Sequence, residues 1–137
     1  MNADIWNILH DGSVLSVSGT VPGDVQFALW IDYLRSRFPD PGDRLLVTLH
    51  GCTSLSYQLY GEDTALTEFD AIADAKPEIL QAKDWTDAGV AECVSGTLRA
   101  TATDFSLSLD SGRVITFDEL CAASNAYWTA FGESSHR

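Results

Sequence analysis

The chain has 137 residues, of which 45% are hydrophobic, and its 20 acidic and 8 basic residues give a net charge of -12. Its length and hydrophobic content fit a single globular domain over residues 1–137 with its own core, and no apolar run reaches the roughly 18 residues of a spanning helix. The negative charge disfavours nucleic acid and anionic membranes as partners but is compatible with a basic protein.

The first alternating patterns follow a turn. Residues 1–9 fit either a short helical turn or an extended lead-in, and His10-Asp11-Gly12 is a turn-forming triplet. Apolar and polar residues then alternate over 15–21, which is typical of a strand with one buried face. After a second turn at 22–24, the same alternation predicts a longer strand over 25–33.

Two further strands follow a loop at 39–43, where two prolines prevent regular pairing. Alternation over 45–50 and again over 55–60, with a short connection at 51–53, predicts that these two strands pair as a hairpin. Residues 10–60 are therefore expected to form an antiparallel meander.

The middle of the chain, residues 61–88, has eight acidic residues against two lysines and so carries half of the net charge. Apolar residues at helical spacing, with Asp63 or Thr64 as N-cap, predict a short amphipathic helix over 64–75, the alternative being an ordered loop. Residues 79–82 fit a short strand and 84–89 a turn.

The second half predicts further strands and a closing helix. Residues 90–103 fit one long strand that bends at Gly96, or two strands that meet there at a bulge. Alternation over 105–109 and a turn before 114–117 predict a second meander, and a shared apolar face predicts a helix over 118–131.

These elements favour a mainly β (α+β) fold: an antiparallel β-sandwich or partly open barrel of about seven to eight strands, with a short acidic helix in the middle and a C-terminal helix. Trp30 and Ala28 lie on the second face of the 25–33 strand, which indicates that a second sheet or the C-terminal helix covers that face.

No stretch carries a specific catalytic or cofactor motif, and no cofactor is expected. His10, Asp11, His50 and Cys52 are the candidates for a metal site or a hydrolase, but they lack the paired spacing that zinc sites usually show. A turn-capping role for His10-Asp11, and a role for Cys52 as a small buried hydrophobe, are the stronger interpretations. The three cysteines form no CxxC pair, and no N-terminal run resembles a signal peptide, so a reducing cytoplasm is the expected compartment.

The acidic middle is the candidate partner-binding segment. The residues expected to meet a basic partner are Glu62, Asp63, Glu68, Asp70 and Asp74. Such electrostatics would speed association and would depend on salt. A third alternative is a structural subunit whose edge strand or Trp-bearing face builds a homodimer.

The opening LHDGSVLSVSG, followed by the LLVTLHGCTSLSYQLYG stretch and the acidic middle, resembles small uncharacterised bacterial β-rich proteins that begin with a His-Asp-Gly or His-Asp-Ser strand entry. Some of those are suspected toxin-immunity proteins. The resemblance covers about the first sixty residues and implies no catalytic residue. The mainly β pattern, the negative charge and the missing catalytic motif favour a non-enzymatic, soluble interaction or small-ligand-binding module. In its sharper form this hypothesis is an immunity-like module whose acidic middle meets a basic protein partner.

Overall fold

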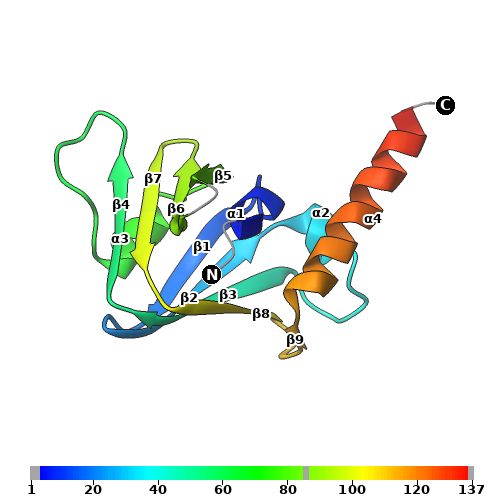
Figure 1. Cartoon of the computed structure of the whole chain (residues 1–137), viewed down its shortest axis with the longest axis horizontal. Helices are drawn as coiled ribbons and strands as arrows, with labels where there is room; N and C mark the ends of the chain where they lie inside the picture. Colours follow the sequence, from blue (N-terminus) through cyan, green and yellow to red (C-terminus); the bar gives the residue numbers. More distant parts are fainter. Residues whose placement is uncertain (1–3, 85–86, 136–137) are drawn as a thin grey trace.

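The computed structural model describes residues 4–84 and 87–135, and its strands form two antiparallel sheets (Figure 1). One sheet has the order β1-β2-β3-β8-β9 and the other has the order β4-β7-β6-β5. The strands are β1 (Ser13–Gly19), β2 (Gly23–Trp30), β3 (Arg44–Cys52), β4 (Ser54–Leu59), β5 (Ile79–Asp84), β6 (Asp87–Cys93), β7 (Gly96–Thr101), β8 (Asp104–Leu109) and β9 (Val114–Ile115). The helices are α1 (Asp4–Ile8), α2 (Asp32–Arg35), α3 (Phe69–Asp74) and α4 (Phe117–Ser135). The mainly β, sandwich-like architecture predicted from the alternation is confirmed, and the sheets do not close into a barrel.

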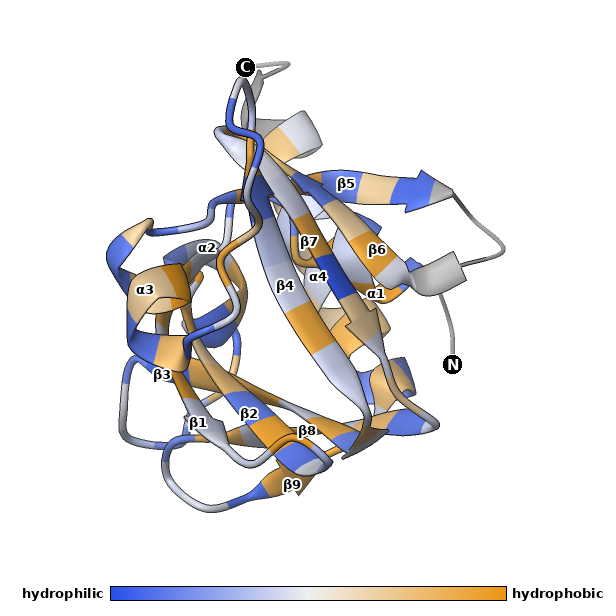
Figure 2. Cartoon of the chain, turned by 90° about the vertical axis from the view of Figure 1, so that its left-hand side faces the viewer, coloured by the Kyte–Doolittle hydropathy of each residue, from blue (hydrophilic) through white to orange (hydrophobic). Residues whose placement is uncertain are grey.

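The two sheets bury one face each in a common core. In the five-stranded sheet the register places Phe27 opposite Val47 and Leu29 opposite Leu45, and all four side chains are buried. The second sheet contributes Tyr57, Leu98 and other residues to the same apolar cluster. Figure 2 shows the alternation of hydropathy along the strands that makes this possible, since every second side chain points to the same face.

The strand predicted over 25–33 is shorter, because β2 ends at Trp30 and residues Asp32–Arg35 form the helix α2. Ile31 and Leu34, three residues apart, are both buried. A helical turn brings residues at this spacing to one face, whereas a strand would send them to opposite faces. The expected cover over Trp30 is also wrong: its side chain is 42% exposed, with the Arg44 guanidinium 5.4 Å from the ring centre.

The expected hairpin between 45–50 and 55–60 is wrong. β3 lies between β2 and β8, so neither of its sides is free for β4. The chain instead turns at Gly51, where φ is +61°, and crosses to the second sheet, where β4 pairs with β7.

Residues 90–103 form neither a bent strand nor a bulge, because β6 and β7 pair with each other as an antiparallel hairpin. Gly96 begins β7, and a Cβ there would overlap the Gln58 carbonyl oxygen and lie 2.9 Å from the Tyr57 ring. The glycine is therefore required by the close approach of β4, which nothing in the local sequence pattern reveals.

The helix predicted over 64–75 is shortened to the six residues of α3. Leu66, which fitted the helical spacing, instead exchanges two backbone hydrogen bonds of 2.9 Å with Tyr57 of β4. The predicted strand at 79–82 is confirmed as β5, and the predicted turn at 84–89 falls partly on residues 85–86, which lie outside the described ranges.

The described part of the chain begins and ends with a helix. Residues 1–9, left open between two conformations, contain α1. The helix predicted over 118–131 is present and longer, running from Phe117 to Ser135, and its far half extends beyond the sheets (Figure 1). Among the helices in the described ranges, none has both the length and the apolar character needed to cross a membrane.

Candidate functional site

An open groove of about 950 Å³ lies between the end of β1 and the helix α3. Residues 17–21 line one side, and residues 67–71 together with Asp74 line the other. Figure 2 views the molecule from the side on which β1 and α3 lie. The groove therefore joins the edge of the five-stranded sheet to the acidic middle of the chain.

The helix α3 is held against the core by its apolar face, to which Ile72, Phe69 and Ala73 contribute. Ile72 is fully buried in the common core, and its backbone N–H donates to the Glu68 carbonyl at 3.0 Å. With Ile72 turned inward, Asp70 and Asp74 are exposed, and their spacing of four residues places them on one face of the helix. Burial of this apolar face thus directs both carboxylates outward along the groove.

The floor of the groove is partly apolar and its rim is acidic. Val17 is 8% exposed, Val21 is 39% exposed and Phe69 is half-buried. Glu68, Asp70 and Asp74 are all exposed, and none of them makes an ion pair or a side-chain hydrogen bond with another described residue. Within the described part of the chain these three carboxylates thus lack an ion-pair partner, and their field extends into the groove.

β1 also offers backbone groups along the groove. It is the outermost strand of its sheet, with β2 as its strand partner, and on its other side Ser13 bridges to Glu78 and the Val14 N–H donates to the Pro77 carbonyl at 2.8 Å. Within the described part of the chain, no strand pairs with that side of residues 17–19. A strand edge that lacks a partner strand can act as a template for a further strand.

The five acidic residues predicted to meet a partner are not all brought together. Glu68, Asp70 and Asp74 line the groove. Glu62 and Asp63 are exposed in the loop after β4 and are not part of the groove lining. The Gln58 side chain donates to the Glu62 backbone carbonyl, which ties that loop to β4 and leaves the Glu62 carboxylate outside the contact.

His10 and Asp11 lie at the turn before β1, as the triplet predicted. The Asp11 N–H donates to the Ile79 carbonyl at 2.7 Å, and Asp11 has φ +67°. The His10 ring stacks on Trp128 at 5.5 Å, and the Tyr33 hydroxyl donates to the His10 carbonyl at 2.8 Å. Burial, followed by the charge of Asp11, raises the pKa of Tyr33 to about 12.

His50 and Cys52 have other surroundings. His50 contacts Asp24 and Ser106, and Cys52 is buried with its thiol donating to the Ser54 carbonyl at 3.2 Å. Among the described residues, no group of three or more His, Cys, Asp or Glu side chains is placed to hold a metal ion. His10, Asp11, His50 and Cys52 therefore do not converge on one site.

The three thiols are free. Desolvation raises the pKa of Cys93 to about 12, and burial also raises the pKa of Cys52 and Cys121. Since the thiolate is the metal ligand and the nucleophile, these shifts favour inert thiols that pack as small apolar groups.

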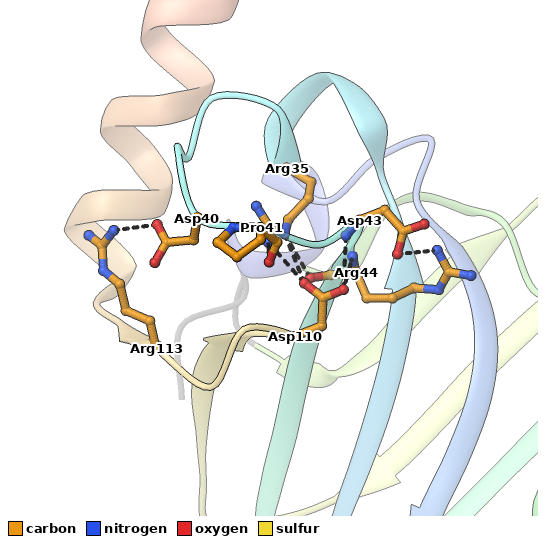
Figure 3. A network of polar contacts seen from close by, with 7 residues as sticks. All are labelled: Arg35, Asp40, Pro41, Asp43, Arg44, Asp110 and Arg113. Atoms are coloured by element: carbon orange, nitrogen blue, oxygen red, sulfur yellow. Dashed lines mark hydrogen bonds and ion pairs between the residues drawn. The ribbon is translucent and has the colours of Figure 1, made fainter.

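A second acidic feature, missed from the sequence, lies at the other end of the sheet and is shown in Figure 3. The buried Arg35 guanidinium donates to Asp110 Oδ1 at 2.9 Å and to the Pro41 carbonyl at 3.0 Å. Asp110 Oδ2 accepts the backbone N–H groups of Asp43 and Arg44 at 2.8 and 3.0 Å. This network fixes the loop 36–43 against the β8–β9 turn, so its role is to hold the fold.

The sequence pattern also missed the β1 side of the groove and the contacts of Asp24 and Ser106. The available signal was that Ser16, Ser18 and Ser106 alternate with apolar residues, which puts them on the open sheet face without saying what they meet. Comparisons of the chain with family models, curated proteins and solved structures found no match.

Proposed function

We propose that this chain is a binding module that takes a basic, extended segment of a partner protein into the groove between β1 and α3. The observation that carries the proposal is the coincidence, in one groove, of a strand edge and three carboxylates that have no strand partner and no ion-pair partner, respectively, among the described residues.

Strand addition is the binding mode that this groove supports. An extended segment paired with residues 17–19 of β1 would direct alternate side chains to opposite sides. Apolar side chains would meet Val17 and Phe69, while Lys or Arg side chains would reach Asp70 and Asp74. A segment that alternates basic and apolar residues is therefore the preferred ligand, with backbone pairing giving affinity and the carboxylates giving selectivity.

The overall charge supports the same partner class. A net charge of -12 attracts a basic protein from a distance and accelerates encounter, and salt weakens this attraction. It also disfavours nucleic acid as the occupant. An immunity-like role toward a basic toxin, in a reducing cytoplasm that keeps the three thiols free, is the form of the proposal that follows from the sequence resemblance.

A homodimer is a second candidate, supported by a different surface. Trp128 is 42% exposed and Phe131 55% exposed on α4, and their ring centres lie 5.7 Å apart. Aromatic side chains are enriched at protein interfaces. Light scattering gives the oligomeric state of the wild-type chain and of W128A/F131A. A wild-type dimer that the double variant disrupts would support this surface as the interface. A monomeric wild-type chain would exclude the homodimer.

The binding proposal is tested by fluorescence anisotropy with a labelled twelve-residue peptide of alternating Lys and Val. The test variant is E68Q/D70N and the matched control is E62Q/D63N, since each pair removes one Glu and one Asp charge. We expect the groove variant to bind about tenfold more weakly and the control to bind like the wild type. Equal weakening in both would show that only overall charge matters and would overturn the groove assignment.

A further inference from the structure

A hydrogen-bonded chain of carboxylate, imidazole and hydroxyl crosses the open face of the five-stranded sheet. Asp24 Oδ2 lies 3.1 Å from His50 Nδ1, and His50 Nε2 lies 2.7 Å from Ser106 Oγ. The three residues come from β2, β3 and β8, which are adjacent strands. The register places their side chains on the face opposite to the buried one, with His50 40% exposed.

The protonation pattern of this chain follows from its chemistry. Hydrogen bonds from the Gly51 backbone N–H, at 3.1 Å, and then from His50 lower the pKa of Asp24, so its carboxylate is ionised and accepts only. His50 Nδ1 must therefore carry the donated proton. In the neutral ring Nε2 is then an acceptor, and the Ser106 hydroxyl must donate to it. This is the tautomer that a general base for a serine nucleophile requires.

A hollow borders β8 at this residue. An open space of about 460 Å³ runs along residues 104–107 of β8, and Ser106 is part of its lining. Apolar side chains contribute much of the remainder, including Phe105 and Phe117, whose ring centres are 6.1 Å apart. β9 pairs with β8 only at Leu107 and Ser108. Among the described strands, none therefore pairs with residues 104–106 on that side of β8.

From this juxtaposition we propose that Ser106 is an activated nucleophile toward small neutral carboxylic esters. His50 is its general base, Asp24 orients His50, and the hollow binds the acyl group. A neutral ester is preferred to a phosphoester because the chain is strongly negative and Asp104 borders the hollow. This activity is independent of the groove between β1 and α3.

The reaction balances without any cofactor. Ser106 Oγ forms a bond to the ester carbonyl carbon as its proton passes to His50 Nε2. When the bond between that carbon and the alcohol oxygen breaks, the leaving oxygen takes the proton back from Nε2. Water then attacks the acyl group by the same path, releasing the carboxylic acid and restoring the Ser106 hydroxyl; nothing is oxidised or reduced.

The test is covalent labelling of the full chain by a neutral fluorophosphonate, with the modified residue identified by mass spectrometry. In this reaction the Oγ–P bond forms, the P–F bond breaks and fluoride leaves while His50 takes the proton. We expect one adduct, at Ser106. The rate should fall at least about 100-fold in H50Q, as expected for loss of a general base, and by a smaller factor in D24N.

Ser108 is the matched control, since it lies two residues further along the same strand, on the same face and also half-buried, but outside the hollow. S108A should label at the wild-type rate and S106A should not label. Hydrolysis of p-nitrophenyl butyrate should follow the same order. An adduct at Ser108 as readily as at Ser106, no adduct on Ser106 of the wild-type chain, or a labelling rate unchanged in a folded H50Q variant would overturn the proposal.

Discussion

Two acidic regions of this molecule use their carboxylates in opposite ways. At one end of the five-stranded sheet, Asp110 accepts two backbone N–H groups and the buried Arg35 guanidinium (Figure 3). Beside β1, Asp70 and Asp74 have no ion-pair partner among the described residues. A charge that is satisfied internally stabilises the fold, whereas a charge without an internal partner is available to an external one.

The largest expected change in stability comes from disrupting the network around Asp110 and Arg35. Asp110→Asn replaces one acceptor oxygen by an amide that cannot accept the Asp43 and Arg44 N–H groups, and it leaves Arg35, whose side chain is 2% exposed, without its counter-charge. We expect a loss of about 3 kcal/mol in the free energy of unfolding, because a buried cation loses its partner. Urea denaturation at pH 7 measures it. A loss below about 1 kcal/mol would mean that the network does not hold the fold.

Acid should reproduce part of that loss in the wild-type chain. Desolvation, the largest single influence, raises the pKa of Asp110, but hydrogen bonds from the Asp43 N–H, from Arg35 and from the Arg44 N–H, with the charge of Arg35, outweigh it and hold the pKa below its ordinary value. A lowered folded-state pKa gives stability that is complete above the unfolded value, about 3.9, and is lost as pH falls through the folded value.

The stability difference between the wild type and D110N should therefore be constant near neutral pH and shrink below about pH 4. Urea denaturation of both chains between pH 2 and 7 checks it. A difference that stays constant down to pH 2 would contradict the assigned role of the Asp110 carboxylate.

Replacing the carboxylates beside the groove by amides should leave the free energy of unfolding almost unchanged. For E68Q/D70N we expect a change within about 0.5 kcal/mol of either sign, since both side chains are exposed and lack internal partners. Thermal and urea unfolding measure it alongside the weakened peptide binding. A clear destabilisation would show that these carboxylates support α3 itself.

The smallest expected change in stability comes from an exposed ion pair next to the Asp110 network. Asp43 and Arg44 form an ion pair of 2.8 Å, with side chains 59% and 36% exposed. Asp43→Asn should cost at most about 0.5 kcal/mol, because solvent screens such pairs. The contrast with D110N, whose carboxylate accepts the Asp43 backbone N–H in the same network, isolates burial of the partner as the cause. A loss in D43N as large as that in D110N would remove this distinction.

The sequence predicts the strands that have one wet face, and it predicts where charge accumulates. Alternation was sufficient for β3 and β8, and the acidic composition coincides with the side of the groove formed by α3. For β1 it misplaced the buried face, because the strand runs over Ser13–Gly19 with a register shift between Val14 and Ser16, which buries Val14 and leaves Leu15 exposed. It could not show that β3 already has two neighbours, which is why the predicted hairpin to β4 fails. Leu66 fits a helical face and a strand bridge equally well, and only its pairing with Tyr57 decides between them.

The sites escaped prediction for the same reason. Asp24, His50 and Ser106 are separated by 26 and 56 residues, and only the strand order brings them into hydrogen-bonding distance. The groove likewise needs β1 at the edge of its sheet, a property of the whole topology that no local pattern encodes.

The most direct test of the binding proposal is a titration of the ¹⁵N-labelled chain with the unlabelled Lys-Val peptide, followed by amide chemical shifts at about 50 mM salt, where screening is weak. The account predicts that shifts concentrate at residues 17–21 and 67–74 and fade as salt is raised. Shifts concentrated on the loop with Glu62 and Asp63 or on α4, or no shifts at low salt, would contradict it.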